Sequence, residues 1–542
     1  MSVLPERPDL DQLKRQAKEL LRLCRAGDGG ALDRLRRGLP AARGRGDAQV
    51  AASGCRLHDA QSCIAREHGF ASWAALKAFV EAARPRGLQP GALAEAFARF
   101  AYAGDIAGGT GNARPELAVR LLQDQPRLPL DFPIIACAAG DVAAVRRAIL
   151  ADAGWVHRPA GPLSLPPLVA ATHSGLLQLP AFRPRIHAVV GQLLSAGADP
   201  DQRVGSRWPP ASVREPDAGM PLSALYGAVG RNHDADLARL LLEAGADPND
   251  GESLYHSLEG PGCTDLLLAA GAVVTGTNAL FRCLDFDDVA RLRLLLDHAG
   301  AAPELRGGAL LFHAIRRRRS PAHVRALLAA GVDPGARTGD GTDAAALALR
   351  YGLPEVASLL GRPDALSPEE RFIAACTSAD AAKARRMLSQ DPGLVARLDP
   401  ARLRLLPDLA AEGAGDAVRL MVELGWPIEA RGGDWNASAL NHAVFRGDSA
   451  LAEFLLQHGA SWRAGQGFGD DVSGTLGWAS LNRPVPEGDW IGCARVLARH
   501  GMAPFGRDPA TPDALLLEGR RRYFSPEVAD CLLNEAAGDL GP

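Results

Sequence analysis

Residue patterns that could carry out catalysis are few in this sequence of 542 residues. A serine hydrolase needs its nucleophile on a GxSxG turn, a nucleotide-binding enzyme needs a GxxxxGK[ST] loop, and a zinc peptidase needs HExxH on a helix. None of these motifs occurs. Gly108–Gly111 is glycine-rich, but no lysine follows it that could reach a phosphate, so we interpret it as a plain loop. The sequence therefore predicts no enzyme and no cofactor.

Three groups of side chains could ligate a metal, and each is incomplete. Cys55, His58 and Cys63 lack the fourth ligand of a zinc site. The acidic residues at 285–288 and 470–471 lack the spacing of an EF-hand loop. We interpret the cysteines as helix-packing residues and Asp287 and Asp288 as helix N-caps, so no metal site is predicted.

Composition narrows the class of protein. The net charge is −3 and the hydrophobic fraction is 47%, which is typical of a globular chain and not of a dedicated nucleic-acid binder. No apolar run approaches the ~18 residues of a membrane span, and the first residues lack the apolar region of a signal peptide. The nine cysteines are scattered, with no CxxC pair. These features predict a reduced, cytoplasmic protein, and the scarcity of lysine beside arginine is typical of a GC-rich bacterial gene.

One phrase recurs along most of the chain. It pairs leucines with a following Gly-Ala or Gly-Val and then often Asp-Pro, and its clearest copies lie at 193–200, 241–249, 267–272, 327–334 and 455–460. In the second copy, Leu237, Leu240 and Leu241 share one face of a helix, and Gly245 stands where a left-handed residue would end that helix. A second phrase precedes such helices, with Ser223 or Ser438 placed to cap a short helix. Each unit is thus a short helix, a loop and a longer helix, and only stacked units can bury their apolar faces.

These phrases resemble the ankyrin repeat family. Residues 241–249 match the family's second-helix ending and its Gly-Ala-Asp-Pro-Asn turn closely, while 166–171, 223–228 and 438–443 match its first-helix signature loosely. The resemblance covers roughly 90–535 and implies an all-α, ankyrin-like helical repeat solenoid. The first residues resemble the helical leader of some bacterial ankyrin repeat proteins, which implies an N-terminal helical cap.

The chain divides into three predicted parts: an N-terminal helical cap at 1–86, a first repeat array at 87–361 and a second array at 367–536. Residues 135–156 align with residues 239 positions later, which suggests an internal duplication. Stretches 203–221 and 463–490 are interpreted as insertions between repeats.

The resemblance also implies a binding surface, because residues just before the glycine that closes each first helix line the concave face of an ankyrin stack. This rule selects arginine and aromatic residues, types that are enriched at interface hot spots. The candidate binding residues are Arg231, Phe286, Arg316, Arg317, Arg350, Tyr351, Phe445 and Arg446, together with Trp435 on a preceding turn.

We therefore expect a non-catalytic, monomeric scaffold that binds a partner protein along this face. One alternative is an enzyme or effector whose activity lies in an insertion or in the N-terminal segment. A second is nucleic-acid binding through Arg316–Arg319, a run that is also explained as a solvated helix end.

Overall fold

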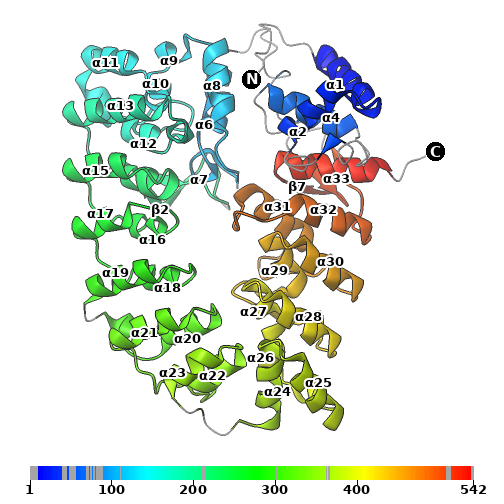
Figure 1. Cartoon of the computed structure of the whole chain (residues 1–542). Helices are drawn as coiled ribbons and strands as arrows, with labels where there is room; N and C mark the ends of the chain where they lie inside the picture. Colours follow the sequence, from blue (N-terminus) through cyan, green and yellow to red (C-terminus); the bar gives the residue numbers. More distant parts are fainter. Residues whose placement is uncertain are drawn as a thin grey trace.

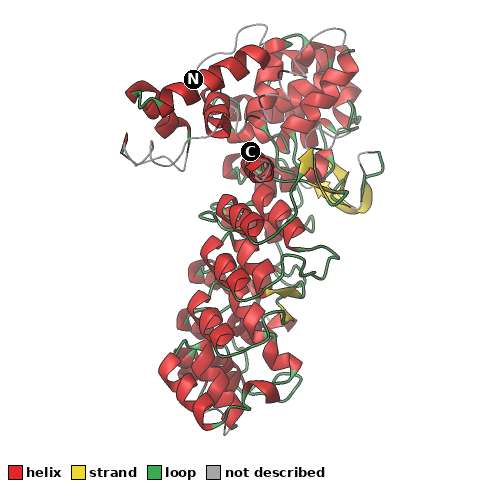
Figure 2. Ribbon diagram, turned by 90° about the vertical axis from the view of Figure 1, so that its right-hand side faces the viewer, coloured by secondary structure: helices red, strands yellow, loops and turns green. Residues whose placement is uncertain are grey.

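The computed structural model describes residues 10–39, 46–47, 57–68, 73, 76, 80, 89–109, 111–209, 211–212, 214–300, 302–361, 363, 366–507 and 514–538. Within them the chain is built from helices, with a few short strands to one side of the stack (Figure 2). The all-α prediction is confirmed.

Three helices form an N-terminal module, namely α1 (Leu10–Arg25), α2 (Gly29–Gly38) and α4 (Leu57–Glu67). Their apolar faces meet in a separate buried cluster that includes Leu20, Leu35 and Ile64. Trp73, Leu76 and Val80 belong to the same cluster, as the helical spacing in this region predicts. Cys55, Gly69, Ser72 and Phe79 lie outside the described residues.

The rest of the chain forms two arms that run in opposite directions (Figure 1). The first arm consists of α6 (Pro90–Ala101), α7 (Gly104–Ala107), α8 (Pro115–Asp124), α9 (Leu128–Asp131), α10 (Pro133–Ala139), α11 (Val142–Ala151), α12 (Pro167–Thr172), α13 (Arg183–Ser195), α14 (Ala224–Tyr226), α15 (Ala235–Glu243), α16 (Ser253–Ser257), α17 (Thr264–Ala269), α18 (Ala279–Cys283), α19 (Val289–Ala299), α20 (Ala309–Arg316), α21 (Pro321–Ala329), α22 (Ala344–Arg350) and α23 (Pro354–Leu360). The second arm consists of α24 (Pro368–Thr377), α25 (Ala381–Gln390), α26 (Pro400–Leu403), α27 (Leu405–Ala411), α28 (Gly415–Glu423), α29 (Ala439–Arg446), α30 (Ser449–Gln457), α31 (Val472–Asn482), α32 (Trp490–Arg499) and α33 (Pro526–Gly538).

Strands are confined to turns between units. They are β1 (Arg203–Ser206), β2 (Asp217–Ser223), β3 (Arg431–Gly432), β4 (Ala437–Ser438), β5 (Gly506–Arg507), β6 (Leu515–Leu517) and β7 (Arg520–Arg522). All pairings are antiparallel, β1 with β2, β3 with β4, and β6 with both β5 and β7. The stretch 203–221 is thus a hairpin. The interpretation of 463–490 as an insertion is wrong, because it contains α31, which packs on α29 as the first helix of its own unit.

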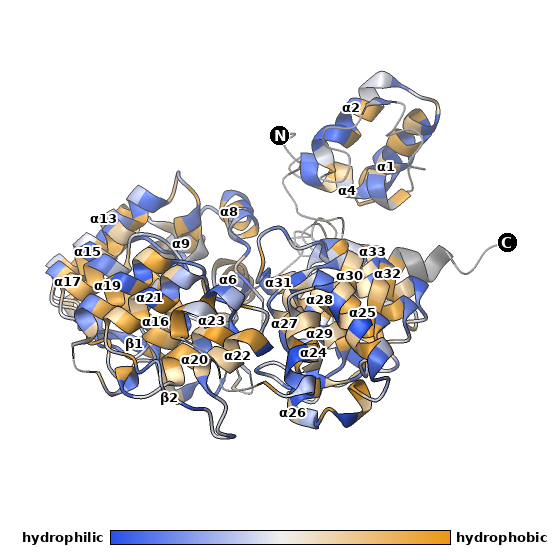
Figure 3. Ribbon diagram, turned by 60° about the horizontal axis from the view of Figure 1, so that its bottom comes forward, coloured by the Kyte–Doolittle hydropathy of each residue, from blue (hydrophilic) through white to orange (hydrophobic). Residues whose placement is uncertain are grey.

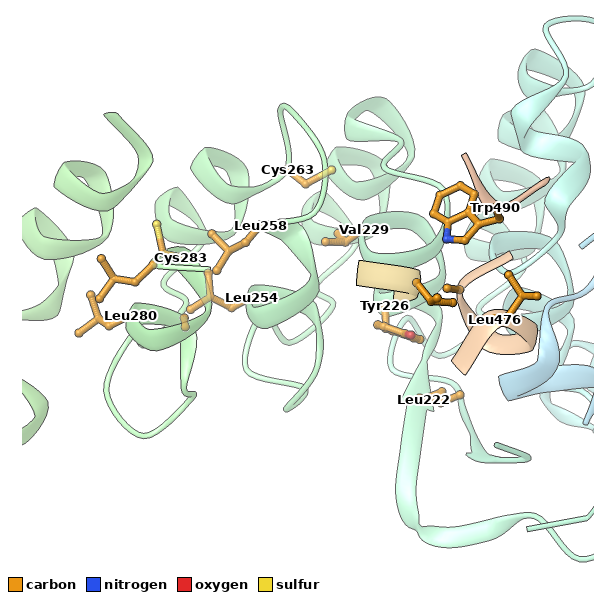
Figure 4. Packing of buried hydrophobic residues seen from close by; sticks show 14 of the residues in the cluster. Leu222, Tyr226, Val229, Leu254, Leu258, Cys263, Leu280, Cys283, Leu476 and Trp490 are labelled. Atoms are coloured by element: carbon orange, nitrogen blue, oxygen red, sulfur yellow. The ribbon is translucent and has the colours of Figure 1, made fainter. Parts of the chain in front are cut away.

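Each unit pairs an inner helix, which faces the other arm, with an outer helix. Consecutive inner helices pack on one another, except α24 and α27, which share no extended interface. The inner helices are α10, α12, α14, α16, α18, α20, α22, α24, α27, α29 and α31. The outer helices pack on one another less continuously, for example α11 on α13, α19 on α21 and α30 on α32. Leu254 of α16 and Leu258, which directly follows that helix, lie next to Leu280 and Cys283 of α18 (Figure 4), which shows how neighbouring units share a core. Hydrophobic residues are concentrated on the stacked helices of both arms (Figure 3).

Local signals in the sequence explain these helix ends. The side chain of Ser223 accepts a hydrogen bond from the backbone N–H of Tyr226, 2.9 Å away, and Ser438 caps α29 in the same way. Asp288 caps α19, as predicted. Gly245 has φ +97°, the left-handed conformation that its place after α15 requires.

The two arms are continuous at the bend between them. Inner helix α22 packs on α24, and one buried cluster includes residues from Ala94 to Leu532. The division into an N-terminal cap at 1–86 and arrays at 87–361 and 367–536 stays a prediction.

Candidate functional site

Three aromatic side chains form a ladder along the inner face of the second arm. Trp435 lies on the turn between β3 and β4, Phe445 near the end of α29, and Trp478 on α31. The rings of Phe445 and Trp478 are stacked, with centroids 5.4 Å apart and planes inclined by 9°. The Trp435 ring lies 5.6 Å from that of Phe445. Trp478 is 39% exposed, so the ladder (Trp435, Phe445 and Trp478) presents aromatic surface to solvent.

The turn that carries Trp435 is rigidly supported. Gly433 and Asn436 both have positive φ, and the Trp435 ring packs edge-on against His442, 4.6 Å away. The carbonyl of Trp435 accepts a 2.7 Å hydrogen bond from the backbone N–H of Gly467 in the next loop. The ladder is therefore preformed and would lose little conformational entropy on binding.

Arg317 joins the two arms beside the ladder. Its Nε donates to Asp285 in the first arm at 2.7 Å, its Nη1 to Glu412 in the second arm at 3.2 Å, and its Nη2 to Asp434, the neighbour of Trp435. Burial alone would lower the pKa of Arg317, but the three carboxylates outweigh burial and raise it. Arg317 is thus committed to an intramolecular contact.

Two further candidate residues lie inside the bend. Tyr351 is buried, and its hydroxyl donates to Asp408 of α27 at 2.8 Å. Arg350 pairs with Glu370 of α24 at 3.0 Å. Their side chains hold α22 against the second arm, which differs from the predicted open position on a concave face.

The three remaining candidate binding residues, Arg231, Phe286 and Arg446, lie at separate positions along the inner face. Arg231 pairs with the buried Asp105 at 2.6 Å, and Phe286 packs on the core beneath the guanidinium of Arg282. Arg446 donates to the carbonyl of Ala411, the last residue of α27. The structure thus brings Trp435 and Phe445 into contact, places Arg317 beside them and leaves Arg231 and Arg350 elsewhere.

The arginine run at 316–319 is not a solvated helix end. Arg316 is exposed, but Arg317 pairs with carboxylates, Arg318 donates to the carbonyl of Tyr351, and Arg319 pairs with Glu412. Three of the four guanidinium groups are therefore engaged within the chain. This correction also removes most of the free positive charge on which phosphate binding at this run would depend.

A polar network continues from Arg317 along the inner face of the first arm. Burial alone would lower the pKa of His256, but hydrogen bonds with Glu252 and Glu259 raise it to about 9. Burial opposes ionisation of Glu259 as well, yet His256 and Arg282 hold its pKa at about 2. Asp285 accepts from His313 and Arg317 and also has a pKa of about 2. His256, Glu259 and Asp285 are therefore charged at neutral pH, and the positive and negative charges of the network offset one another.

The buried side chain of His442 makes the free energy of unfolding depend on pH. Burial lowers the pKa of this histidine to about 4, compared with about 6.5 in an unfolded chain. The unfolded state then binds the proton more tightly, so stability is lost as pH falls from 6.5 towards 4, by roughly 3 kcal/mol at full protonation. We expect His442→Phe, which keeps an aromatic ring beside Trp435, to flatten this loss in urea unfolding measured between pH 7 and 4.5. An unchanged slope would contradict the prediction.

Other groups that could do chemistry have structural partners. Cys63 Sγ donates to the carbonyl of Arg34, and Asp471 caps α31. Asp470 pairs with Arg522. The side chains of Cys55 and His58 lie outside the described residues. In the part of the chain that is described, no three His, Cys, Asp or Glu side chains gather as a metal site would require.

The selection rule missed Trp478, although this ring completes the ladder. The rule reads the residues before a closing glycine, whereas α31 ends at Asn482 and Arg483, a non-glycine residue with φ +48°. It also missed the three carboxylates that bind Arg317. Nothing in a linear sequence shows that residues 32, 95 and 117 positions away, as Asp285, Glu412 and Asp434 are, will meet the same side chain. The unusual length of the unit between Gly459 and Gly501 was the available signal for Trp478.

Comparison with known proteins identifies similar structures but no similar sequences. No protein-family model and no curated protein matches the chain. Among solved structures, the human ASB11 ankyrin repeat domain is similar with 18% identity and a TM-score of 0.31, over 43% of this chain and 98% of that one. The ankyrin repeat domain of Bcl-3, described as a unique member of the IkappaB family, is similar with 22% identity and a TM-score of 0.20, over 48% of this chain and 99% of that one.

The helix pairs, their stacking and the left-handed glycines between units define the fold class. The chain is an all-α, ankyrin-like helical repeat solenoid preceded by an N-terminal helical module. No helix in the described ranges is both long enough and apolar enough to cross a bilayer.

Proposed function

We propose that this protein is a non-catalytic scaffold that binds a partner protein through the aromatic ladder of the second arm. The observation that carries the proposal is the stacked pair Phe445 and Trp478, extended by Trp435. Aromatic rings bury a large area with few rotatable bonds, and Trp and Tyr dominate interface hot spots. Trp478 is 39% exposed and stacks on Phe445, so the two rings together present aromatic surface to solvent. Such a patch supports a role in binding.

Arginine residues around the ladder supply the polar part of the proposed surface. Arg446 follows Phe445 directly and uses one nitrogen on the Ala411 carbonyl. Arg316 is exposed at the end of α20 in the first arm. Such groups would bind carboxylates or carbonyls at the rim of the interface, while the rings anchor apolar side chains.

The proposal includes a monomeric protein of a reducing compartment, the cytoplasm of a bacterium. Every cysteine in the described residues is free and buried, which suits a compartment where disulfides do not form. Nucleic acid is not the expected partner, because Arg317, Arg318 and Arg319 are engaged within the chain.

Ladder variants test the proposal directly. We expect Phe445→Ala/Trp478→Ala, and separately Trp435→Ala/Arg446→Ala, to weaken partner binding by about 30-fold or more, the loss typical of hot-spot residues. The measurement is affinity capture from a lysate of a GC-rich bacterium, followed by titration of the captured protein by calorimetry.

The matched control is Phe468→Ala. Phe468 lies on the same arm and is 82% exposed, but it is outside the ladder. A protein that binds the wild type and the Phe468 variant but not the ladder variants supports the proposal. Equal binding by all four proteins would place the interface elsewhere, and a measured turnover would overturn the non-catalytic assignment.

A further inference from the structure

The first and last units of the solenoid touch each other. Asn112, in the loop between α7 and α8, donates from Nδ2 to the carbonyl of Leu481 in α31 at 2.8 Å, although the two residues are 369 positions apart. Arg66 of the N-terminal module lies 4.0 Å from Glu527 of α33. In Figure 1, α6 to α8 and α31 to α33 occupy the same end of the two arms. We call this pair of contacts, Asn112–Leu481 and Arg66–Glu527, the mouth.

Both described contacts of the mouth are weak. One contact is a single exposed amide–carbonyl bond, and the other is a partly exposed ion pair at the distance limit of such pairs. No helix of the first arm shares an extended interface with α31, α32 or α33 within the described residues. Direct helix packing of the kind that joins neighbouring units therefore does not join the two arms here.

The bend at the other end is strongly held. Helix α22 packs on α24 within a continuous core, Tyr351 binds Asp408, and Arg317 binds two carboxylates of the second arm. Arg317 and Glu412 are mostly buried, with side chains 20% and 12% exposed, and are screened less by solvent than the mouth contacts. The described contacts between the arms are therefore much stronger at the bend than at the mouth.

The N-terminal module is attached mainly to the first arm. Leu117 of α8 belongs to the module's own buried cluster, and Phe100 of α6 packs against that cluster. Its described polar contact with the second arm is the Arg66–Glu527 pair. Separation at the mouth would therefore carry the module away together with the first arm.

The ladder lies between these two contacts. Trp435 is next to Asp434, which binds Arg317 at the bend side. Trp478 lies one helical turn before Leu481, whose backbone carbonyl accepts the hydrogen bond from Asn112 at the mouth. The ladder is thus close to both a strong and a weak contact between the arms.

We propose that the solenoid is a clamp with a fixed bend and a mouth that opens. Opening breaks the Asn112–Leu481 and Arg66–Glu527 contacts, swings the first arm and the N-terminal module outward, and admits a segment of the partner to the ladder. The last step depends on the proposed function, whereas the opening itself is a property of the free protein.

Distances between spin labels test the opening without any partner. Glu116 on α8 and Arg495 on α32 are exposed and report on the mouth, while Glu355 on α23 and Lys383 on α25 report on the bend. Cysteines introduced at each pair carry the labels, in a full-length background with Cys55→Ser. Pulsed electron–electron double resonance then gives the distance distribution for each pair.

We expect two distances for the 116/495 pair and one for the 355/383 pair. Asn112→Ala/Glu527→Gln should raise the open population about fivefold, the factor for one lost net hydrogen bond, and leave the 355/383 distance unchanged. A single 116/495 distance, the same in both backgrounds, would overturn the clamp, and so would a broadened 355/383 distribution. Thermal unfolding by circular dichroism confirms that each variant is folded.

This result is separate from the outcome of the ladder variants. If the mouth opens and the ladder variants still bind the partner, the proposed interface fails and the clamp stands. If the mouth stays shut and the ladder variants lose binding, the interface stands and the clamp fails.

Discussion

Replacing Gly352 with alanine is expected to lower the free energy of unfolding by about 3–4 kcal/mol. Gly352 follows α22 with φ +71°, a conformation in which any side chain is strained. A Cβ atom there would lie 2.6 Å from the carbonyl carbon of Thr377 and closer still to its oxygen. Thr377 ends α24, so the added atom would push apart the two helices that join the arms.

Gly331→Ala is the matched control for this substitution. Gly331 has a comparable φ of +93° but no atom within 4 Å of the Cβ position. It should lose only about 1–2 kcal/mol, the strain of the left-handed conformation. Urea unfolding of both variants measures the difference, and equal losses would mean that the close approach at the bend is absent in solution.

Arg317→Met is expected to lower stability by about 2–3 kcal/mol, because it leaves the mostly buried Glu412 and the half-buried Asp285 without their main cation. Methionine keeps much of the apolar stem, so the loss reports the charge and its hydrogen bonds. Chemical unfolding at pH 7 provides the measurement. The effect should include a broader 355/383 distance distribution, since the same side chain joins the arms.

A double-mutant cycle separates the pair from general damage. Glu412→Gln removes the carboxylate charge, and the double variant Arg317→Met/Glu412→Gln should recover about 1–2 kcal/mol relative to the sum of the single losses. Simple additivity would show that Arg317 and Glu412 do not interact in solution. Arg316→Met, at the exposed neighbour, should change stability by less than about 0.5 kcal/mol.

Much of the architecture was predictable because it depends on local features. The recurring leucine pairs fix a helix face, Ser223 and Ser438 fix helix starts, and Gly245 fixes a helix end. Each of these acts within a few residues, so periodicity and capping rules identify them directly.

The candidate site was predictable only in part. Trp435 and Phe445 were selected from their positions in the repeat, and they are in contact. Trp478 was not selected, because α31 lies in a stretch without the repeat's usual closing glycine. Tyr351 and Arg350 were placed on an open surface, yet the bend buries or pairs them.

The sequence by itself determined that this protein is a stack of two-helix units, because caps, turns and helix periodicity are written in neighbouring residues. Only the tertiary structure decided that the stack turns back on itself. The turn depends on small rotations between successive units that add up along the chain, and on contacts such as Arg317 with Asp434, 117 positions apart. No local signal encodes that distance, so the opposition of the two arms, and with it the position of the ladder between them, emerged only in three dimensions.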